Sequence, residues 1–338
     1  MALPTVRPFT AQDTAAAAGL LAARLAEGHA RVPFIDPALG LPAAVEGFVR
    51  GLVANPFADG VIAEAGGEAL GFLFGQRMLI PPTEMAALFV PPHSISIPVE
   101  GHAVAAASDP TVVYREMYRH LAAQWVRDGY FIHRTAILAG HADEQEAWVS
   151  LGFGRAMTAA TRRAADPVTN IRPTGIEVHR AGTEDIDLVT RLSDVLMEHH
   201  NRAPIFWALL KEPHQQTRAF NLGFLEAGAT PYFIGYQQGE PVAMTTFIRP
   251  GFTPPVVAHG SDIYLFEGIV TEAARSGGVG TAVLGEALSW VRENGFETCT
   301  LHFASGNYSA APFWLGHGFV PVEHTMERHV DERVAWAR

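Results

Sequence analysis

The segment RSGGVG, residues 275–280, could hold an anionic group. An arginine and three glycines stand here, where a β-rich stretch ends and an amphipathic stretch begins. The first turn of a helix leaves backbone N–H groups unpaired at the positive end of its dipole, and glycines let a bulky anion approach them. The spacing differs from the Gly-x-x-x-x-Gly-Lys-Ser/Thr phosphate loop and from the dinucleotide pattern of three spaced glycines. Taken alone, the segment fits an anion site or an ordinary tight turn.

A wider pattern of residues surrounds this loop. Its further positions are Val270, Asn307, Ala310, Trp314, Gly318 and Phe319. Together with the loop they resemble the GNAT superfamily of acetyl-CoA-dependent N-acetyltransferases. The signature of that family is Val-x-x-x-x-Arg-x-x-Gly-x-Gly/Ala, followed by Asn-x-x-Ala and an aromatic-x-x-x-Gly-Phe ending. The match covers residues 263–320, and an internal repeat extends the resemblance to a tandem GNAT protein.

The resemblance implies a set of residues that bind coenzyme A. The backbone of Ile269 and Val270 would pair with the pantetheine arm, and Asn307 would reach the cofactor from the start of the last helix. The residues implied at the pyrophosphate are Arg275, Ser276, Gly277, Gly278, Val279, Gly280 and Thr281.

The resemblance also implies a general base on the preceding strand, and Glu267 is the candidate. Such a base needs a raised pKa or a bridging water. A structural role is the alternative, in which Glu267 pairs with a backbone group or an arginine. Many family members carry a tyrosine as general acid where this chain has Trp314, and indole cannot protonate a thiolate near neutral pH. Water, Tyr308 and His302 are the substitutes left open.

An internal repeat divides the chain into two halves. WVRDGYFIHRTAILA (125–139) resembles WVRENGFETCTLHFA (290–304). Four further pairs of similar segments occur in the same order along the two halves. The polar segment 162–175 carries two prolines and no periodicity. We therefore expect a degenerate GNAT-like domain at 1–164, a linker at 165–172 and a GNAT domain with the acetyl-CoA site at 173–338.

Each half predicts an α/β fold, with a mixed, mostly antiparallel central sheet flanked by helices. In the second half, residues 231–249 predict a hairpin and residues 261–271 a long strand. The stretch 277–294 predicts a helix, whose apolar side chains recur on one face.

The first half lacks the glycine loop, because SDPTVV (108–113) stands in its place. Pro110 removes a backbone donor, so we expect no coenzyme A there. Asp109 and Pro110 predict instead an N-cap and first turn of a helix. The first half would then be a scaffold, a wall of the acceptor site or an interaction surface. Its Pro-rich segment 80–98 predicts either a flap over that site or a long covering loop.

Composition narrows the class of protein. The 338 residues carry a formal net charge of −11, which argues against a nucleic-acid partner. No apolar run approaches the roughly 20 residues of a membrane helix, and the N-terminus has no secretory pattern. Together with the single cysteine this indicates a cytoplasmic protein.

Cysteine and histidine supply no metal site in this sequence. Cys299 lies in a predicted strand and is expected to be buried as a small apolar residue. His199 and His200 are adjacent, so they do not share a helix face and predict two exposed polar histidines rather than ligands.

The resemblance predicts an acyltransferase, EC 2.3.1.-, that transfers acetyl directly from acetyl-CoA to a small amine or a peptide. A mycothiol synthase-like enzyme is a narrower version of it. A non-enzymatic acyl-CoA sensor or scaffold is the alternative from another class, and nucleotide binding at the glycine loop is a third. A homodimer is compatible with each of them, and the sequence sets no oligomeric state.

Overall fold

The computed structural model describes residues 3–168, 175–249, 251–257 and 261–336. The predicted linker at 165–172 falls partly on residues 169–174, which lie outside the described residues. Within the described ranges, every helix is too short or too polar to cross a bilayer.

Thirteen strands in the described part of the chain form one continuous sheet. The strands are β1 (Thr5–Pro8), β2 (Ala58–Ala65), β3 (Glu68–Leu79), β4 (His93–Ile97), β5 (His102–Val104), β6 (Ile132–Leu138), β7 (Gly154–Arg163), β8 (Ile176–Arg180), β9 (Tyr232–Gln237), β10 (Glu240–Ile248), β11 (Asp262–Val270), β12 (Thr298–Ala304) and β13 (Val320–His329). Their spatial order is β1-β2-β3-β4-β6-β13-β7-β12-β11-β10-β9-β8, and β5 pairs with β3.

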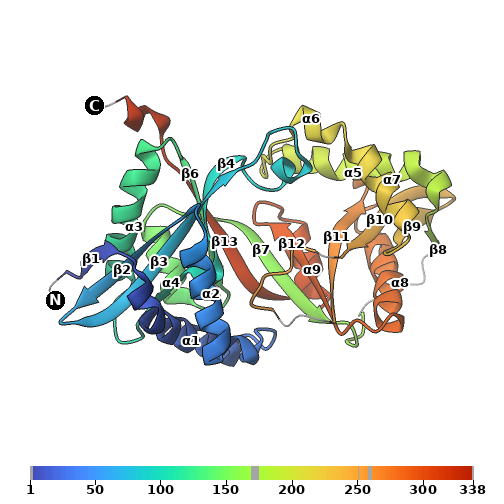
Figure 1. Cartoon of the computed structure of the whole chain (residues 1–338). Coiled ribbons are helices and arrows are strands. Elements are labelled where there is room, and N and C mark those ends of the chain that lie inside the picture. The colour runs from blue at the N-terminus through green and yellow to red at the C-terminus, as the bar shows by residue number, and fades with distance from the viewer. Residues whose placement is uncertain (1–2, 169–174, 250, 258–260, 337–338) are drawn as a thin grey trace.

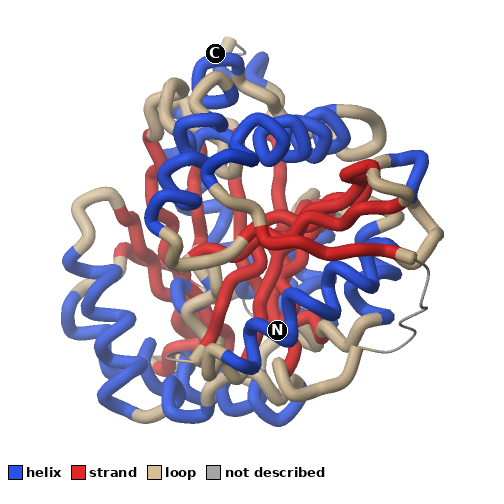
Figure 2. The backbone as a smooth tube through the Cα atoms, turned by 90° about the vertical axis from the view of Figure 1, so that its right-hand side faces the viewer, coloured by secondary structure: helices blue, strands red, loops and turns tan. Residues whose placement is uncertain are grey.

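Helices cover both faces of this sheet (Figure 2). They are α1 (Thr14–Arg31), α2 (Pro42–Ala54), α3 (Pro110–Arg127), α4 (Ala142–Ser150), α5 (Ile186–Asn201), α6 (Lys211–His214), α7 (Thr217–Ala227), α8 (Val279–Glu293) and α9 (Ala310–Gly316). Only β4–β6 and β11–β12 pair in parallel among the described strands. The predicted mixed, mostly antiparallel α/β fold is therefore confirmed.

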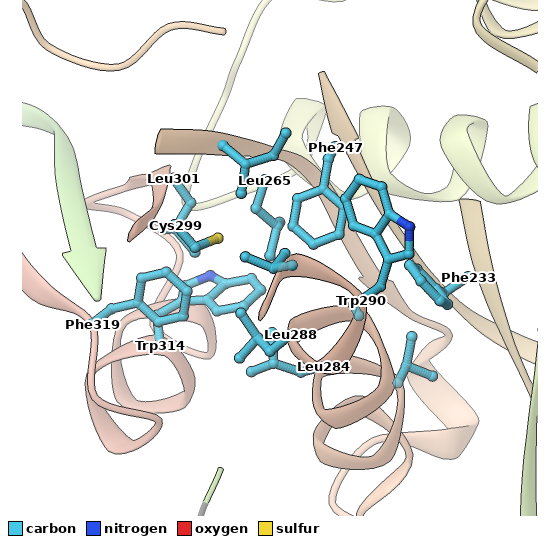
Figure 3. Close-up of a cluster of buried hydrophobic side chains, with 14 of the residues drawn as sticks. Phe233, Phe247, Leu265, Leu284, Leu288, Trp290, Cys299, Leu301, Trp314 and Phe319 are labelled. Carbon is cyan, nitrogen blue, oxygen red and sulfur yellow. The ribbon is translucent and has the colours of Figure 1, made fainter. Parts of the chain in front are cut away.

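The hairpins and helix ends form where the sequence supplies suitable residues. Gln238 and Gly239 have φ of 54° and 81° in the two-residue turn between β9 and β10, as a type I′ hairpin requires. The five apolar positions expected on one face of α8 are buried, namely Val283, Leu284, Ala287, Leu288 and Val291. They pack on β9, β10 and β11 in the core of the second half (Figure 3). Cys299 is buried in the same core, as predicted.

The last strand of each half completes the sheet of the other half. β13, which ends the second half, lies between β6 and β7 and pairs antiparallel with both (Figure 1). β7, which ends the first half, pairs with β12 of the second. The sequence repeat does not predict this exchange, because either pairing satisfies the same alternation of apolar residues.

The exchanged strands also contribute to the hydrophobic cores. Met326 and Val322 of β13 are buried in the two cores of the first half. Ala160 and Ala164, in and just after β7, are buried in the core of the second half. Each half therefore depends on the other for both hydrogen bonds and apolar contacts.

We predict that Met326→Ala destabilises both halves together. Met326 is 0% exposed, so truncation should lower the free energy of unfolding by about 2–5 kcal/mol. Urea unfolding, followed separately at ¹⁹F-labelled Trp125 and Trp290, should show one shared, lowered midpoint. The matched control is Val320→Ala on the same strand, whose residue is 38% exposed; it should change the free energy by only about 0.5 kcal/mol. An unchanged midpoint at Trp290 in Met326→Ala would contradict the interdependence.

Candidate functional site: a cavity at the glycine loop

The glycine loop turns the chain from β11 into α8 with two residues in the left-handed region. Ser276 has φ of 64° and Gly278 has φ of 84°. The amide of Ala282 donates to the Gly278 carbonyl, so the amides of residues 276–281 find no backbone acceptor in the described part of the chain. The loop therefore presents several N–H groups at the positive end of the helix dipole.

Gly280 allows α8 to approach its neighbours closely. A Cβ atom at this position would lie 3.1 Å from a Val270 methyl and 3.2 Å from the Phe313 ring. The absence of a side chain thus brings the first turn of α8 against both β11 and α9.

The strands β11 and β12 separate beside this loop. They pair only over Asp262–Tyr264 and Thr298–Thr300. Beyond this point β11 keeps β10 as partner, with Ile269 opposite Met244 and Val270 opposite Ala243. Its other edge is left open toward α9 and the glycine loop.

A cavity of about 450 Å³ fills the space between these elements. Nine of the ten predicted cofactor residues line it, namely Ile269, Val270, Arg275, Ser276, Gly278, Val279, Gly280, Thr281 and Asn307. Gly277 belongs to the same loop but does not line the cavity. Residues distant in sequence are therefore brought to one place.

The side chains of Asn307 and Arg275 both form hydrogen bonds with backbone groups at the cavity. The Asn307 side-chain oxygen accepts from the Ala310 amide at 3.2 Å and from the Ser309 hydroxyl at 2.9 Å, which caps α9. The Arg275 guanidinium donates to the Val270 carbonyl at 3.2 Å.

Glu267 is buried on β11 but does not line the cavity. Two residues away, Ile269 does line it, and both side chains lie on the α5 face of the strand. Ser193 donates to the Glu267 carboxylate at 2.9 Å, Asn221 donates to Ser193 at 3.1 Å, and Tyr232 donates to Asn221 at 3.1 Å. Burial raises the pKa of Glu267 to about 7, although the hydrogen bond from Ser193 opposes the shift.

Trp314 occupies the position where the resemblance implies an acid. Its indole lies against β11, because a Cβ on Gly268 would come within 2.8 Å of the ring. His302 contacts the Tyr264 hydroxyl at 2.9 Å, and burial lowers the pKa of His302 to about 4. His302 is therefore uncharged near neutral pH, and Tyr308 is largely exposed.

The first half has no equivalent loop. Asp109 caps α3 by accepting from the Thr111 amide at 2.9 Å, and Pro110 occupies the first turn, as predicted. Glu100, which resembles Glu267 in sequence, lies in the single-turn helix Val99–Gly101 rather than in a paired strand. The segment between β4 and β5 has two residues more than the matching part of β11. The pairing with β3 around Glu100 therefore differs in register from the pairing of β10 with β11 around Glu267.

The expectation of two exposed histidines is wrong. His199 is half-buried and lines the cavity, whereas His200 stacks on Trp207 with ring centroids 5.2 Å apart. Burial lowers the pKa of His200 to about 4. The adjacent segment Arg202–Trp207 folds back over the end of α5, which the sequence pattern did not indicate.

The segment 80–98 of the first half reaches the second half. Phe89 lies 5.7 Å, between ring centroids, from Phe266, which precedes Glu267. Gln216 donates to the Thr83 carbonyl at 2.7 Å. The segment thus contacts β11 at the residue before Glu267 and the start of α7, and its role as a flap over an acceptor site stays a prediction.

Several residues at the site were not identified from the sequence. They are Val195, Leu196, Thr245, Phe313, Ser193, Asn221 and Tyr232. The amphipathic pattern of α5 could have indicated Val195 and Leu196 as inward-facing. No spacing connects Ser193, Asn221 and Tyr232 to Glu267, because only the tertiary fold brings them together.

Comparison with known proteins finds a family match within the second half. Residues 195–319 match the family model described as the acetyltransferase (GNAT) family. A GCN5-related N-acetyltransferase from Sphaerobacter thermophilus has a similar structure, with a TM-score of 0.55 and 14% identity over 96% of this chain and 95% of that chain. No curated protein sequence matches significantly.

Two further solved structures are similar. One is a GCN5-related glucosamine N-acetyltransferase region of a fungal multi-domain GH3 β-N-acetylglucosaminidase, with a TM-score of 0.52 and 10% identity over 97% of this chain and 38% of that chain. The other is a tandem GNAT protein from the clavulanic acid biosynthesis pathway, with a TM-score of 0.49 and 14% identity over 96% of this chain and 98% of that chain.

The segment that carries the glycine loop therefore belongs to the GNAT family of acetyltransferases. The GNAT fold extends over nearly the whole chain. Membership in this family implies an acyltransferase, EC 2.3.1.-, with an acyl-CoA donor and an amine acceptor.

Proposed function

We propose that the second half binds acetyl-CoA and transfers its acetyl group directly to an amine acceptor. The observation that carries this proposal is the cavity that joins the free amides of residues 276–281 to the open edge of β11. A pyrophosphate suits several converging N–H groups at a helix N-terminus. An extended amide-containing arm suits an unpaired strand edge.

The chain's own residues fit coenzyme A. The amides of the glycine loop would hold the pyrophosphate, and the backbone of Ile269 and Val270 would face the pantetheine arm. Asn307, which accepts a hydrogen bond at the start of α9, also lines the cavity and would contact the cofactor. When bound, acetyl-CoA would supply an acetyl group activated as a thioester.

Glu267 is the proposed general base. With a pKa of about 7, its carboxyl is partly ionised at neutral pH and can accept a proton from an amine, directly or through water. Ser193 positions the carboxylate, and Asn221 and Tyr232 position Ser193. The half-buried Val195 and Leu196, which follow Ser193 on α5, line the cavity.

We predict one acetyl-CoA site per chain, which Gly278→Asp abolishes. The new carboxylate would stand among the amides that hold the pyrophosphate, so charge repulsion adds to the strain at positive φ. Gly295→Asp is the matched control, because Gly295 also has positive φ, at 78°, in open space at the end of α8. Isothermal titration of acetyl-CoA should show binding to wild type and Gly295→Asp. Two sites, or binding that survives in Gly278→Asp, would contradict the assignment.

A second prediction concerns the pH dependence of acetyl transfer. Because Glu267 must be ionised, kcat/KM should rise with pH through about 7 and then level off. Glu267→Gln should lower it by roughly 10²–10⁴-fold and remove this limb. Ser193→Ala should move the limb to higher pH, since the hydrogen bond from Ser193 favours the charged carboxylate.

The assay is acceptor-dependent release of free coenzyme A, measured with the same amine for all variants. Ser289→Ala on α8, away from the cavity, is the control for Ser193→Ala. An unchanged pH limb in Glu267→Gln would exclude Glu267 as the base. Binding of acetyl-CoA without release in the presence of any amine would favour the sensor alternative.

A further inference from the structure

A second cavity, of about 330 Å³, lies in the first half between β4, β6 and β13. These three strands run side by side at the left of centre in Figure 1. The parallel strands β4 and β6 pair only over Ile95–Ile97 and His133–Thr135 and then separate, as β11 and β12 do in the second half. Exposed Pro255 stands at the edge of the cavity, so a ligand can enter from solvent there.

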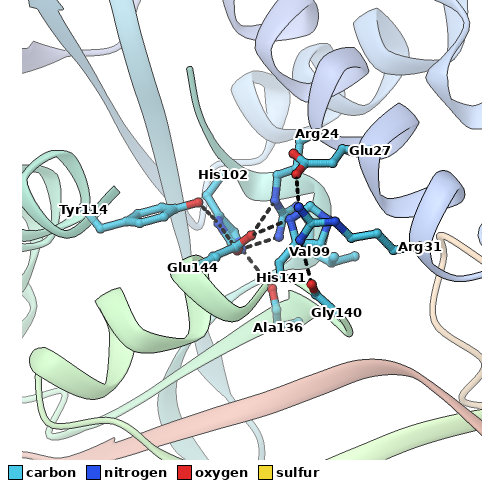
Figure 4. Close-up of polar contacts among 10 residues, drawn as sticks. All are labelled: Arg24, Glu27, Arg31, Val99, His102, Tyr114, Ala136, Gly140, His141 and Glu144. Carbon is cyan, nitrogen blue, oxygen red and sulfur yellow. Dashed lines mark hydrogen bonds and ion pairs between the residues drawn. The ribbon is translucent and has the colours of Figure 1, made fainter. Parts of the chain in front are cut away.

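The arginines near this cavity already have carboxylate partners. Arg24 makes two hydrogen bonds to Glu144, at 2.7 and 3.0 Å, and a third to the Val99 carbonyl at 2.6 Å (Figure 4). Arg134 lies 3.3 Å from the Glu327 carboxylate. Both arginines also attract the Glu323 carboxylate, although neither forms an ion pair with it in the described structure.

Two carboxyl groups in the cavity have no such partner. Glu100 and Glu323 both line it, and no Lys, Arg or His of the described chain forms an ion pair with either. Glu323 is only 7% exposed, and the Glu100 Oε2 atom is buried without a hydrogen-bond partner. Burial and repulsion from Glu100 raise the pKa of Glu323 to about 8, although Arg24 and Arg134 oppose this shift.

A buried hydroxyl group in the same cavity is also unpaired. Thr135 is 0% exposed, and its Oγ1 atom has no hydrogen-bond partner in the described structure. Leaving such polar groups unsatisfied destabilises the folded state. Two unsatisfied oxygens, Glu100 Oε2 and Thr135 Oγ1, and the Glu323 carboxyl group thus line one cavity, in which the Arg134 Nε atom also lacks a hydrogen-bond partner among the described residues. The three oxygen-bearing side chains favour a ligand that supplies hydrogen-bond donors and positive charge.

The size and walls of the cavity define the ligand further. A single water takes up about 30 Å³, so the cavity holds a small molecule rather than a bare ion. The described chain has no group of three or more His, Cys, Asp or Glu residues that could hold a metal. The apolar residues Ile97, Val99 and Ala136 also line the cavity and would contact carbon atoms of a ligand.

We propose that this cavity is a second ligand site, distinct from the glycine loop, and that it binds a compact organic ammonium ion. The ammonium group would lie between the Glu100 and Glu323 carboxylates and the Thr135 hydroxyl, with its alkyl part on the apolar wall. Glu100 comes from the first half and Glu323 from the exchanged strand β13, so both halves build the site.

The test is isothermal titration of the full chain with n-butylammonium chloride at about pH 9. At this pH Glu323 is ionised, and an alkylammonium with a pKa near that of lysine, about 10.4, keeps its charge. We expect one site in wild type and at least tenfold weaker binding of the neutral analogue n-pentanol. Glu323→Gln and Glu100→Gln should each weaken the ammonium at least tenfold.

Two control variants should leave this binding unchanged. Glu332→Gln makes the same change of charge at an exposed position, and Glu267→Gln alters the proposed acceptor side of the second half. Loss of binding in Glu267→Gln would place the amine in the second half and overturn the proposal without touching the acetyl-CoA assignment. Absence of binding to wild type, or undiminished binding to Glu323→Gln, would also overturn it.

Thermal unfolding of the ligand-free variants separates loss of the site from loss of the fold. Glu323→Gln removes a buried, unpaired carboxylate, so its midpoint at pH 9 should be at least as high as that of wild type. If Glu323→Gln instead unfolds, Glu100→Gln, at a partly exposed position, decides the outcome alone.

Discussion

Backbone pairing of the exchanged strands is the constraint on which the rest of this structure depends. β13 is hydrogen-bonded on both edges, to β6 and to β7, and β7 in turn pairs with β12. In this arrangement β13 is the strand that joins β6 to β7, and β7 is the outer partner of β12. The two halves of the sequence repeat therefore share one sheet, and each contributes a strand to the part of the sheet formed by the other.

The exchange also supports the cavity at the glycine loop. Arg162 of β7 is fully buried and donates to the His317 carbonyl at the end of α9. The His317 ring in turn contacts the Thr281 hydroxyl at 3.1 Å, in the first turn of α8. A strand of the first half thus fixes, through two side chains, the relative position of the two helices that border the cavity. In the same way, β13 of the second half contributes Glu323 to the lining of the second cavity, in the first half.

The sequence predicted the parts that depend on local chemistry. The hairpin at Gln238-Gly239, the Asp109-Pro110 helix start and the amphipathic α8 follow from residue types over a few positions, and all three are present. The glycine loop was found in the same way. The strand exchange, the partners of Glu267 and the stacking of His200 on Trp207 were not predicted. They depend on contacts between distant segments, for which a single sequence has no periodicity or spacing to read.

We propose that, of the two halves, only the second holds the pyrophosphate, at the loop of residues 275–281. Hydrogen–deuterium exchange of the intact chain, with and without acetyl-CoA, tests it most directly, because the claim concerns backbone amides. We expect slower exchange at residues 276–281, where the amides find no backbone acceptor in the described structure, and unchanged exchange at residues 108–113. Protection at residues 108–113, or no protection at 276–281 under saturating acetyl-CoA, would contradict it.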